Sequence, residues 1–385
     1  MLYLDHAATT PVRPEVLQAM LPYLTERFGN PSSHHTVGEA AAEALADARR
    51  RVAAVLGFRP ADIVFTSGGT EADNLAVKGL AIGAALHRAA GGRPPPVHVI
   101  TTPIEHEAVL ASCEYLDRVH GYAVTRLSVD ATGSVDPETV AAAIRPDTAL
   151  VSIGYANNEI GTVQDAAALA SVTAAARVPL HLDAVQAAGW LPLAGLGADA
   201  LSLAGHKIGA PQGVGVLAVR SRLPLEPLLH GGGQERGRRS GTEDLAGIVG
   251  FATALELAEA ERVVAAARVT VIRDAFVSRV LELVPNARLT GHPTRRLPGT
   301  ASFTFAGTSG EAVLLQLERR GVVTSSGSAC AAGSDEPSHV LLACGIDPDT
   351  AHTAVRFTLA HTHIADLAPV ADALADAVAT VRSGG

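Results

Sequence analysis

The sequence predicts an α/β protein with a large, mostly parallel sheet and a smaller second domain. Short apolar runs alternate with long Ala-rich helical patterns over much of the chain, which is typical of repeated βαβ units. A length of 385 residues also suits one large α/β domain and one smaller domain. We expect an N-terminal segment (1–14) that associates with the small domain, a large domain (15–250) and a small C-terminal domain (251–385).

The elements follow from these patterns in chain order. Strands of the large domain are predicted at Ile63–Thr66, Val97–Thr101, Ala149–Tyr155, Pro179–Leu182, Ala200–Leu203 and Val214–Val219. Helical patterns precede the first strand and separate the others, for example at Glu39–Leu56, Glu71–Arg88 and Glu107–Val119. A long helix, Leu245–Leu283, should lead into the small domain, with strands at Thr300–Phe305, Val322–Thr324 and Val355–Leu359.

Composition narrows the classes of function. With 30 basic and 39 acidic side chains the net charge is -9, so bulk charge favours neither nucleic acid nor anionic membranes as partners. The start, MLYLDHAATT, does not resemble a signal peptide, and no apolar run is long enough to span a bilayer. Three widely spaced cysteines suit a reducing compartment. We therefore expect a cytoplasmic protein. We expect no metal site. The closely spaced histidines His34 and His35, and His361 and His363, have no cysteine or acidic residue at the spacing of metal ligands.

Polar residues follow the predicted strands, where α/β sheets bind their ligands. In chain order these residues are Ser67–Glu71, His106, Asn157 and Asn158, Asp183 with Gln186, and Lys207. Each group also has a purely structural interpretation. Ser67–Glu71 could be a capping box, His106 a surface histidine, Asn157 and Asn158 a turn, Asp183 a helix cap and Lys207 an exposed loop lysine. Lys207 is the most informative, because only one other lysine, Lys78, occurs in the chain. An amine, unlike a guanidinium, can be deprotonated and attack a carbonyl.

Together these residues match the needs of one cofactor. Pyridoxal 5'-phosphate requires a lysine for its Schiff base, an acid beside the ring nitrogen and a cradle for its phosphate. Lys207, Asp183 and the Gly68-Gly69-Thr70 turn supply these three groups. No GxGxxG motif or Walker A loop follows a strand, which counts against a nucleotide site.

The chain also resembles the NifS/IscS-like cysteine desulfurases, a group within the class V enzymes of the aspartate aminotransferase-like fold. The resemblance covers nearly the whole length. It rests on ordered motifs that include YLDHAATTP (3–11), FTSGGTEADN (65–74), IEHEAVL (104–110), HLDAVQAAG (181–189), AGHKIGAPQGVG (204–215), HGGGQERGRRSGT (230–242) and SSGSAC (325–330).

The resemblance implies a role for each matching residue. Lys207 would bind the cofactor, Asp183 would pair with the ring nitrogen, and His106 would stack on the ring and move protons. The remaining cofactor contacts would come from Gln186, Asn158, Gly69, Thr70, His206 and, from a neighbouring subunit, Thr242. Arg356 and Asn30 would hold the substrate carboxylate. The implied partners are L-cysteine, a second copy of the chain in a homodimer, and a sulfur-acceptor protein.

Cys330 matches the nucleophile that receives sulfur as a persulfide. From the residues alone, it lies in a small-residue segment bracketed by Gly327 and Gly333, which favours an accessible, mobile loop. Cys113 and Cys344 lie in apolar helical patterns, where a cysteine is normally a small buried hydrophobe.

Two departures from the family pattern affect these expectations. Ala204 stands where many relatives have a serine that binds phosphate, so the cradle should lack one hydroxyl. The chain ends at Gly385 without the extension that IscS-type members use to dock an iron–sulfur scaffold. The acceptor therefore stays open between iron–sulfur assembly and thio-modification. A selenocysteine lyase or another C–S lyase would use the same cofactor residues, and a non-enzymatic cofactor-binding scaffold is the third alternative.

Overall fold

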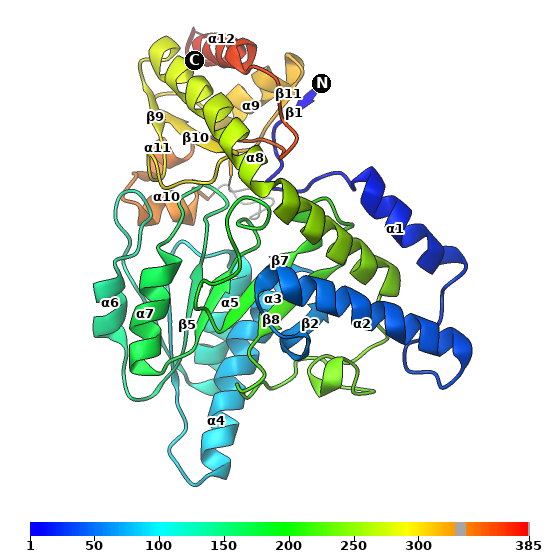
Figure 1. The fold of residues 1–385 in the computed structure, drawn as a ribbon. Helices are drawn as coiled ribbons and strands as arrows, with labels where there is room; N and C mark the ends of the chain where they lie inside the picture. The colour runs from blue at the N-terminus through cyan, green and yellow to red at the C-terminus, as the bar shows by residue number, and fades with distance from the viewer. Residues whose placement is uncertain (328–335, 384–385) are drawn as a thin grey trace.

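The computed structural model describes residues 1–327 and 336–383. It contains a large lobe built on one sheet and a smaller lobe that carries both chain ends (Figure 1). Cys330 lies outside the described residues. No helix in the described ranges is both long and apolar enough to cross a membrane.

The large lobe is organised by a seven-stranded sheet. Its strands, in spatial order, are β2 (Ile63–Thr66), β8 (Gly215–Val219), β7 (Ala200–Ala204), β6 (Leu180–Asp183), β5 (Thr148–Gly154), β3 (His98–Thr101) and β4 (Ala123–Arg126). Strand β8 runs antiparallel to both of its neighbours, and the other pairs are parallel. The predicted mostly parallel sheet is confirmed, with strand boundaries within one residue of those expected.

Helices cover both faces of this sheet because successive strand residues point to opposite sides. Ile63 and Phe65 belong to one apolar core, and Val64 between them belongs to another. The first core includes α1 (Pro14–Thr25), α2 (Thr36–Leu56), α6 (Pro137–Ala143) and α7 (Ala166–Ala176). The second includes α3 (Gly69–Asn74), the π-helical turn η2 (Leu75–Gly79), α4 (Leu80–Ala90) and α5 (Glu107–His120). The helix predicted at Glu71–Arg88 is thus a longer stretch that a π-helical turn interrupts.

A single long helix, α8 (Leu245–Leu283), joins the two lobes (Figure 1). Its first part, to Ala258, packs into the first core of the large lobe, and its later residues Val269, Phe276 and Val280 pack into the small lobe. The predicted boundary between residues 250 and 251 falls inside this helix.

The small lobe holds two short sheets. The antiparallel order is β12 (Val355–Thr358), β10 (Thr300–Phe305), β9 (Ala287–Leu289), and β1 (Leu2–Tyr3) pairs in parallel with β11 (Val322–Val323). Its helices are α9 (Gly310–Arg319), α10 (His339–Ala343), α11 (Pro348–Ala351) and α12 (Ala368–Ser383). The pairing of β1 with β11 brings the N-terminal segment onto this lobe, from which it continues to the edge of the large sheet.

Candidate functional site

A cavity of about 340 Å³ opens at the carboxyl ends of β5, β6 and β7. Parallel strands bring their carboxyl ends to one edge, so residues distant in sequence meet there. Nine of the predicted site residues line this cavity: Gly69, Thr70, His106, Asn158, Asp183, Gln186, His206, Lys207 and Arg356. Its volume suits a small-molecule ligand.

Lys207 follows β7 in a short 3-10 helix, η3 (Gly205–Lys207). Its Nζ donates to the main-chain oxygens of Ala7 and Ala8, the latter at 2.8 Å. Gln186 Nε2 also donates to the Ala7 oxygen, at 3.1 Å. The N-terminal segment therefore forms one wall of the cavity and holds the lysine that the sequence singles out.

Asp183 is the last residue of β6 and faces the same cavity. Its Oδ1 accepts a hydrogen bond from Val185 N at 2.9 Å, which orients the carboxyl group. Burial raises the pKa of Asp183, while the nearby His106 and Lys207 act in the opposite direction. A cationic ligand group beside this carboxyl would favour its ionised form.

Two further buried acids, Asp73 and Glu105, line the cavity but were not predicted as site residues. Burial, followed by the proximity of Asp183, raises the pKa of Asp73 well above its usual value. Burial also raises the pKa of Glu105 to about 8, so this carboxyl is largely protonated at neutral pH. Asp73 Oδ1 and Glu105 Oε2 have no hydrogen-bond partner within the described ranges. Asp73 lies in the motif FTSGGTEADN and Glu105 in the motif IEHEAVL. Their place in these motifs is the sequence feature that could have identified them as site residues.

His106 caps the N-terminus of α5. Its Nδ1 accepts a hydrogen bond from Ala108 N at 3.1 Å. In a neutral imidazole this arrangement places the proton on Nε2. The cap therefore sets both the position of the ring at the cavity wall and its tautomer.

A glycine-rich turn shapes the neighbouring hollow, of about 430 Å³, which Ser67, Gly68, Thr70 and His206 help to line. A side chain at Gly69 would approach Val185 Cγ2 to 2.9 Å, so the close approach of these two segments depends on glycine. Burial lowers the pKa of His206 to about 4, and Lys207 adds to this shift. A neutral imidazole, a hydroxyl and the start of a helical stretch form a donor set that suits an anion.

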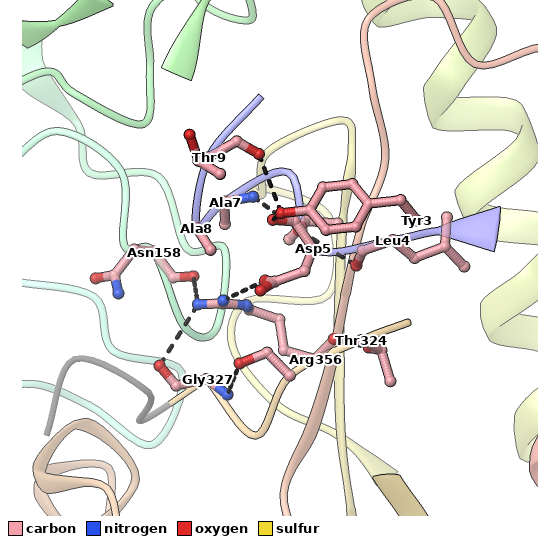
Figure 2. Close-up of polar contacts among 12 residues, drawn as sticks. Tyr3, Leu4, Asp5, Ala7, Ala8, Thr9, Asn158, Thr324, Gly327 and Arg356 are labelled. Carbon is pink, nitrogen blue, oxygen red and sulfur yellow. Dashed lines mark hydrogen bonds and ion pairs between the residues drawn. The ribbon is translucent and has the colours of Figure 1, made fainter. Parts of the chain in front are cut away.

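Arg356 reaches the cavity from β12 of the small lobe (Figure 2). Its Nη2 donates to Asp5 Oδ1 at 2.7 Å and its Nη1 to the main-chain oxygen of Asn158 at 2.8 Å. The cation thus links the N-terminal segment, the large lobe and the small lobe. Asp5, within the YLDHAATTP motif, was not predicted to take part.

Two predicted site residues, Asn30 and Thr242, do not line this cavity and are exposed. The loop before Thr242 is held by Glu235, which makes a buried, doubly hydrogen-bonded ion pair with Arg49 at 2.6 Å. Gly327, three residues before Cys330, does line the cavity. Of the other cysteines, Cys113 and Cys344 are both buried, as predicted.

Comparisons with known proteins agree with this architecture. Residues 2–366 match the family model for aminotransferase class-V. The chain is 45% identical to the cysteine desulfurase IscS of Methanosarcina thermophila over 93% of this chain and 87% of that protein. A solved NifS-like protein superposes with a TM-score of 0.88 at 35% identity, covering 100% of both chains. The structure of SspA in complex with cysteine superposes with a TM-score of 0.79 at 36% identity, over 93% of this chain and 99% of that one.

The chain therefore belongs to the class-V aminotransferase family, in the group of IscS- and NifS-like cysteine desulfurases. The fold and the family predicted from the sequence are confirmed. The roles of the individual site residues remain predictions.

Proposed function

We propose that this protein is a pyridoxal-phosphate-dependent cysteine desulfurase, which converts L-cysteine to L-alanine and transfers the sulfur to Cys330 as a persulfide. The observation that carries the proposal is the single cavity in which Lys207, Asp183, His106 and Arg356 meet. Relatives named cysteine desulfurases are 43–46% identical over nearly the full length, which favours cysteine over selenocysteine as the substrate.

The cavity fits pyridoxal 5'-phosphate in its donor set and its charge. Lys207 would hold the cofactor, the turn at Gly69 and Thr70 with His206 would bind its phosphate, and Asp183 would pair with its ring nitrogen. A positive ring nitrogen beside Asp183 would favour the ionised form of this buried carboxyl. When bound, this cofactor withdraws electrons from the Cα of an amino acid.

The protein's own groups then carry the proton and sulfur transfers. Lys207 is the base that takes the Cα proton, and His106 exchanges protons with the substrate thiol. The Cys330 thiolate attacks the substrate sulfur, and the Cβ–S bond breaks with its electron pair left on the carbon skeleton. That skeleton takes up one proton at Cβ and regains one at Cα, from Lys207, to become alanine. Gln186 and Asn158 would orient the cofactor ring, and Arg356 would bind the substrate carboxylate. The same role implied for Asn30 has no support from the cavity of this chain, because Asn30 is exposed and does not line it.

The other two cysteines are poorly suited to the nucleophilic role. Burial raises the pKa of the Cys113 thiol to about 12 and that of Cys344 to about 11. Both thiols are therefore essentially un-ionised near neutral pH. Because the thiolate is the nucleophile, neither is suited to attack the substrate sulfur. Their burial supports the assignment of sulfur transfer to Cys330.

The cofactor assignment is tested by borohydride reduction of the purified holoprotein. Reduction should bleach its visible absorption and fix about one cofactor per chain covalently onto Lys207, which peptide mass spectrometry locates. Lys78 is the matched control, since Lys78→Arg should keep the adduct and Lys207→Ala should lose it. An adduct on Lys78, or none at all, would contradict the proposed cofactor site.

A homodimer is part of the proposal, with Thr242 completing the site of the neighbouring subunit. Thr242 is exposed in this chain, and its loop is anchored to the glycine-rich turn through Arg239, whose Nε donates to Glu71 at 2.9 Å. The outer side of α1 and the residues after it expose Leu17, Leu21, Leu24 and Phe28. This apolar stripe is favourable for burial against a second copy.

Subunit mixing tests the shared site. A mixture of Lys207→Ala and Thr242→Ala chains, each inactive alone, should recover about one quarter of wild-type activity after exchange, because half of the dimers then hold one intact site. A mixture of Lys207→Ala with Asp183→Ala is the control and should stay inactive, since both residues come from one chain. Failure of the first mixture despite verified exchange would mean that each site is built from one subunit.

The acceptor of the sulfur and the cytoplasmic location are further parts of the proposal. The persulfide on Cys330 would pass to a protein of iron–sulfur assembly or of thio-modification. Comparing turnover of L-cysteine with that of selenocysteine and cystine separates the desulfurase from the lyase alternatives. A desulfurase should form persulfide from cysteine.

A further inference from the structure

Arg356 is paired with a carboxylate of its own chain. Its Nη2 donates to Asp5 Oδ1 at 2.7 Å (Figure 2), and the two side chains are only 4% and 16% exposed. A pair with so little contact with water is weakly screened by solvent. Asp5 is thus the counter-ion of the group to which we assign the substrate carboxylate.

The pairing uses only part of the available donor edge. In a planar guanidinium, Nε and the neighbouring Nη can donate two parallel hydrogen bonds to one carboxylate. Asp5 accepts from Nη2, whereas Nε of Arg356 is buried without a hydrogen-bond partner within residues 1–327 and 336–383. A buried donor without a partner is unfavourable. A carboxylate that accepted from both nitrogens would remove this deficit.

The backbone around Asp5 is held by hydrogen bonds that do not involve its side chain. The Tyr3 hydroxyl donates to the main-chain oxygen of Asp5 at 2.9 Å. On either side, Thr358 N donates to Leu4 O at 2.7 Å and His6 N donates to Thr358 O at 3.3 Å. Rotation of the Asp5 side chain would free the Arg356 edge and leave these backbone contacts in place.

We infer that Asp5 is an internal competitor for the substrate carboxylate at Arg356 and sets the affinity of the site for amino acids. The inference rests on the proposed function, because it takes Arg356 as the carboxylate-binding residue. Two carboxylates at one guanidinium edge repel each other. Asp5 therefore weakens the binding of cysteine and of alanine alike, which also favours product release.

Asp5→Asn separates charge from shape, since it keeps the size and the Oδ1 acceptor. Spectroscopic titration of the holoprotein should show L-alanine binding about tenfold more tightly than to wild type, because one repulsive charge is gone. Ethylamine, which has the amine and methyl groups of alanine without the carboxylate, should bind unchanged. KM for L-cysteine should fall more than kcat changes.

Asp372→Asn is the matched control. Asp372 pairs with Arg279 at 2.7 Å on the surface, and loss of this pair should alter none of these values.

Unchanged or weaker binding of L-alanine to Asp5→Asn would overturn the inference and make Asp5 a residue that only orients Arg356. Asp5→Ala provides a second test of the same gain should the asparagine variant not fold, and Asp5→Glu should return affinity towards the wild-type value. Arg356→Lys distinguishes the two levels of the proposal. If it leaves L-alanine affinity unchanged, the assigned role of Arg356 fails. If it weakens binding while Asp5→Asn has no effect, only the role of Asp5 fails.

Discussion

Cys330→Ser is expected to reduce alanine formation from L-cysteine at least about 1000-fold, because a hydroxyl is a far weaker nucleophile towards sulfur than a thiolate. The variant should still bind pyridoxal 5'-phosphate and still change its visible spectrum when L-cysteine is added. It should carry no persulfide, as measured by mass spectrometry after incubation with L-cysteine. Cofactor binding and sulfur transfer would thereby be separated in one protein.

Cys113→Ser and Cys344→Ser are the controls for this experiment. Both thiols are buried, so each change should lower the free energy of unfolding by about 1 kcal/mol and leave most of the activity. Near wild-type formation of alanine and sulfide by Cys330→Ser would instead indicate a lyase that needs no cysteine nucleophile.

Asp183→Asn is expected to slow removal of the Cα proton about 100- to 1000-fold, because the ring nitrogen loses its anionic partner. The measurement is exchange of the Cα proton of L-alanine in heavy water, followed by NMR, which does not require Cys330. Asparagine can keep the hydrogen bond from Val185 N, so the turn after β6 should persist. The expected loss is therefore electrostatic.

The control for this prediction is Asp165→Asn, a cap whose Oδ1 accepts from Ala168 N at the start of α7 and which does not line the cavity. It changes the same residue type in a similar hydrogen bond and should leave proton exchange unaltered. An exchange rate close to wild type in Asp183→Asn would make Asp183 a structural cap alone.

Several features of this protein could be predicted from local sequence. Strands buried on both faces are nearly continuous apolar runs, so β2, β5, β7 and the long helix α8 were placed within one residue. Elements with weaker patterns were missed, including α1, which begins at Pro14, and the partly exposed strand β4. The helix after Gly68 begins at Gly69, two residues before the predicted start at Glu71. The apolar pattern of this stretch did not predict the π-helical turn Leu75–Gly79.

Sequence alone also determined which chemistry gathers at the sheet edge. Lys207, Asp183 and His106 follow apolar strands, and parallel strands bring their carboxyl ends together whatever the intervening sequence.

Only the tertiary structure decided how the charges of these site residues are balanced. Asp5 is 351 residues from Arg356 in the chain, yet the two are paired at 2.7 Å. The reason is that β1 pairs with β11 and the residues after β1 continue along β12, where Asp5 forms a parallel bridge with Thr358. Likewise, burial of Asp73 and Glu105 beside Asp183, which raises their pKa values, depends on the packing of α3 and the turn before α5 against the sheet. Periodicity reports local burial, whereas ion pairs and pKa shifts depend on distances between segments that no local pattern encodes.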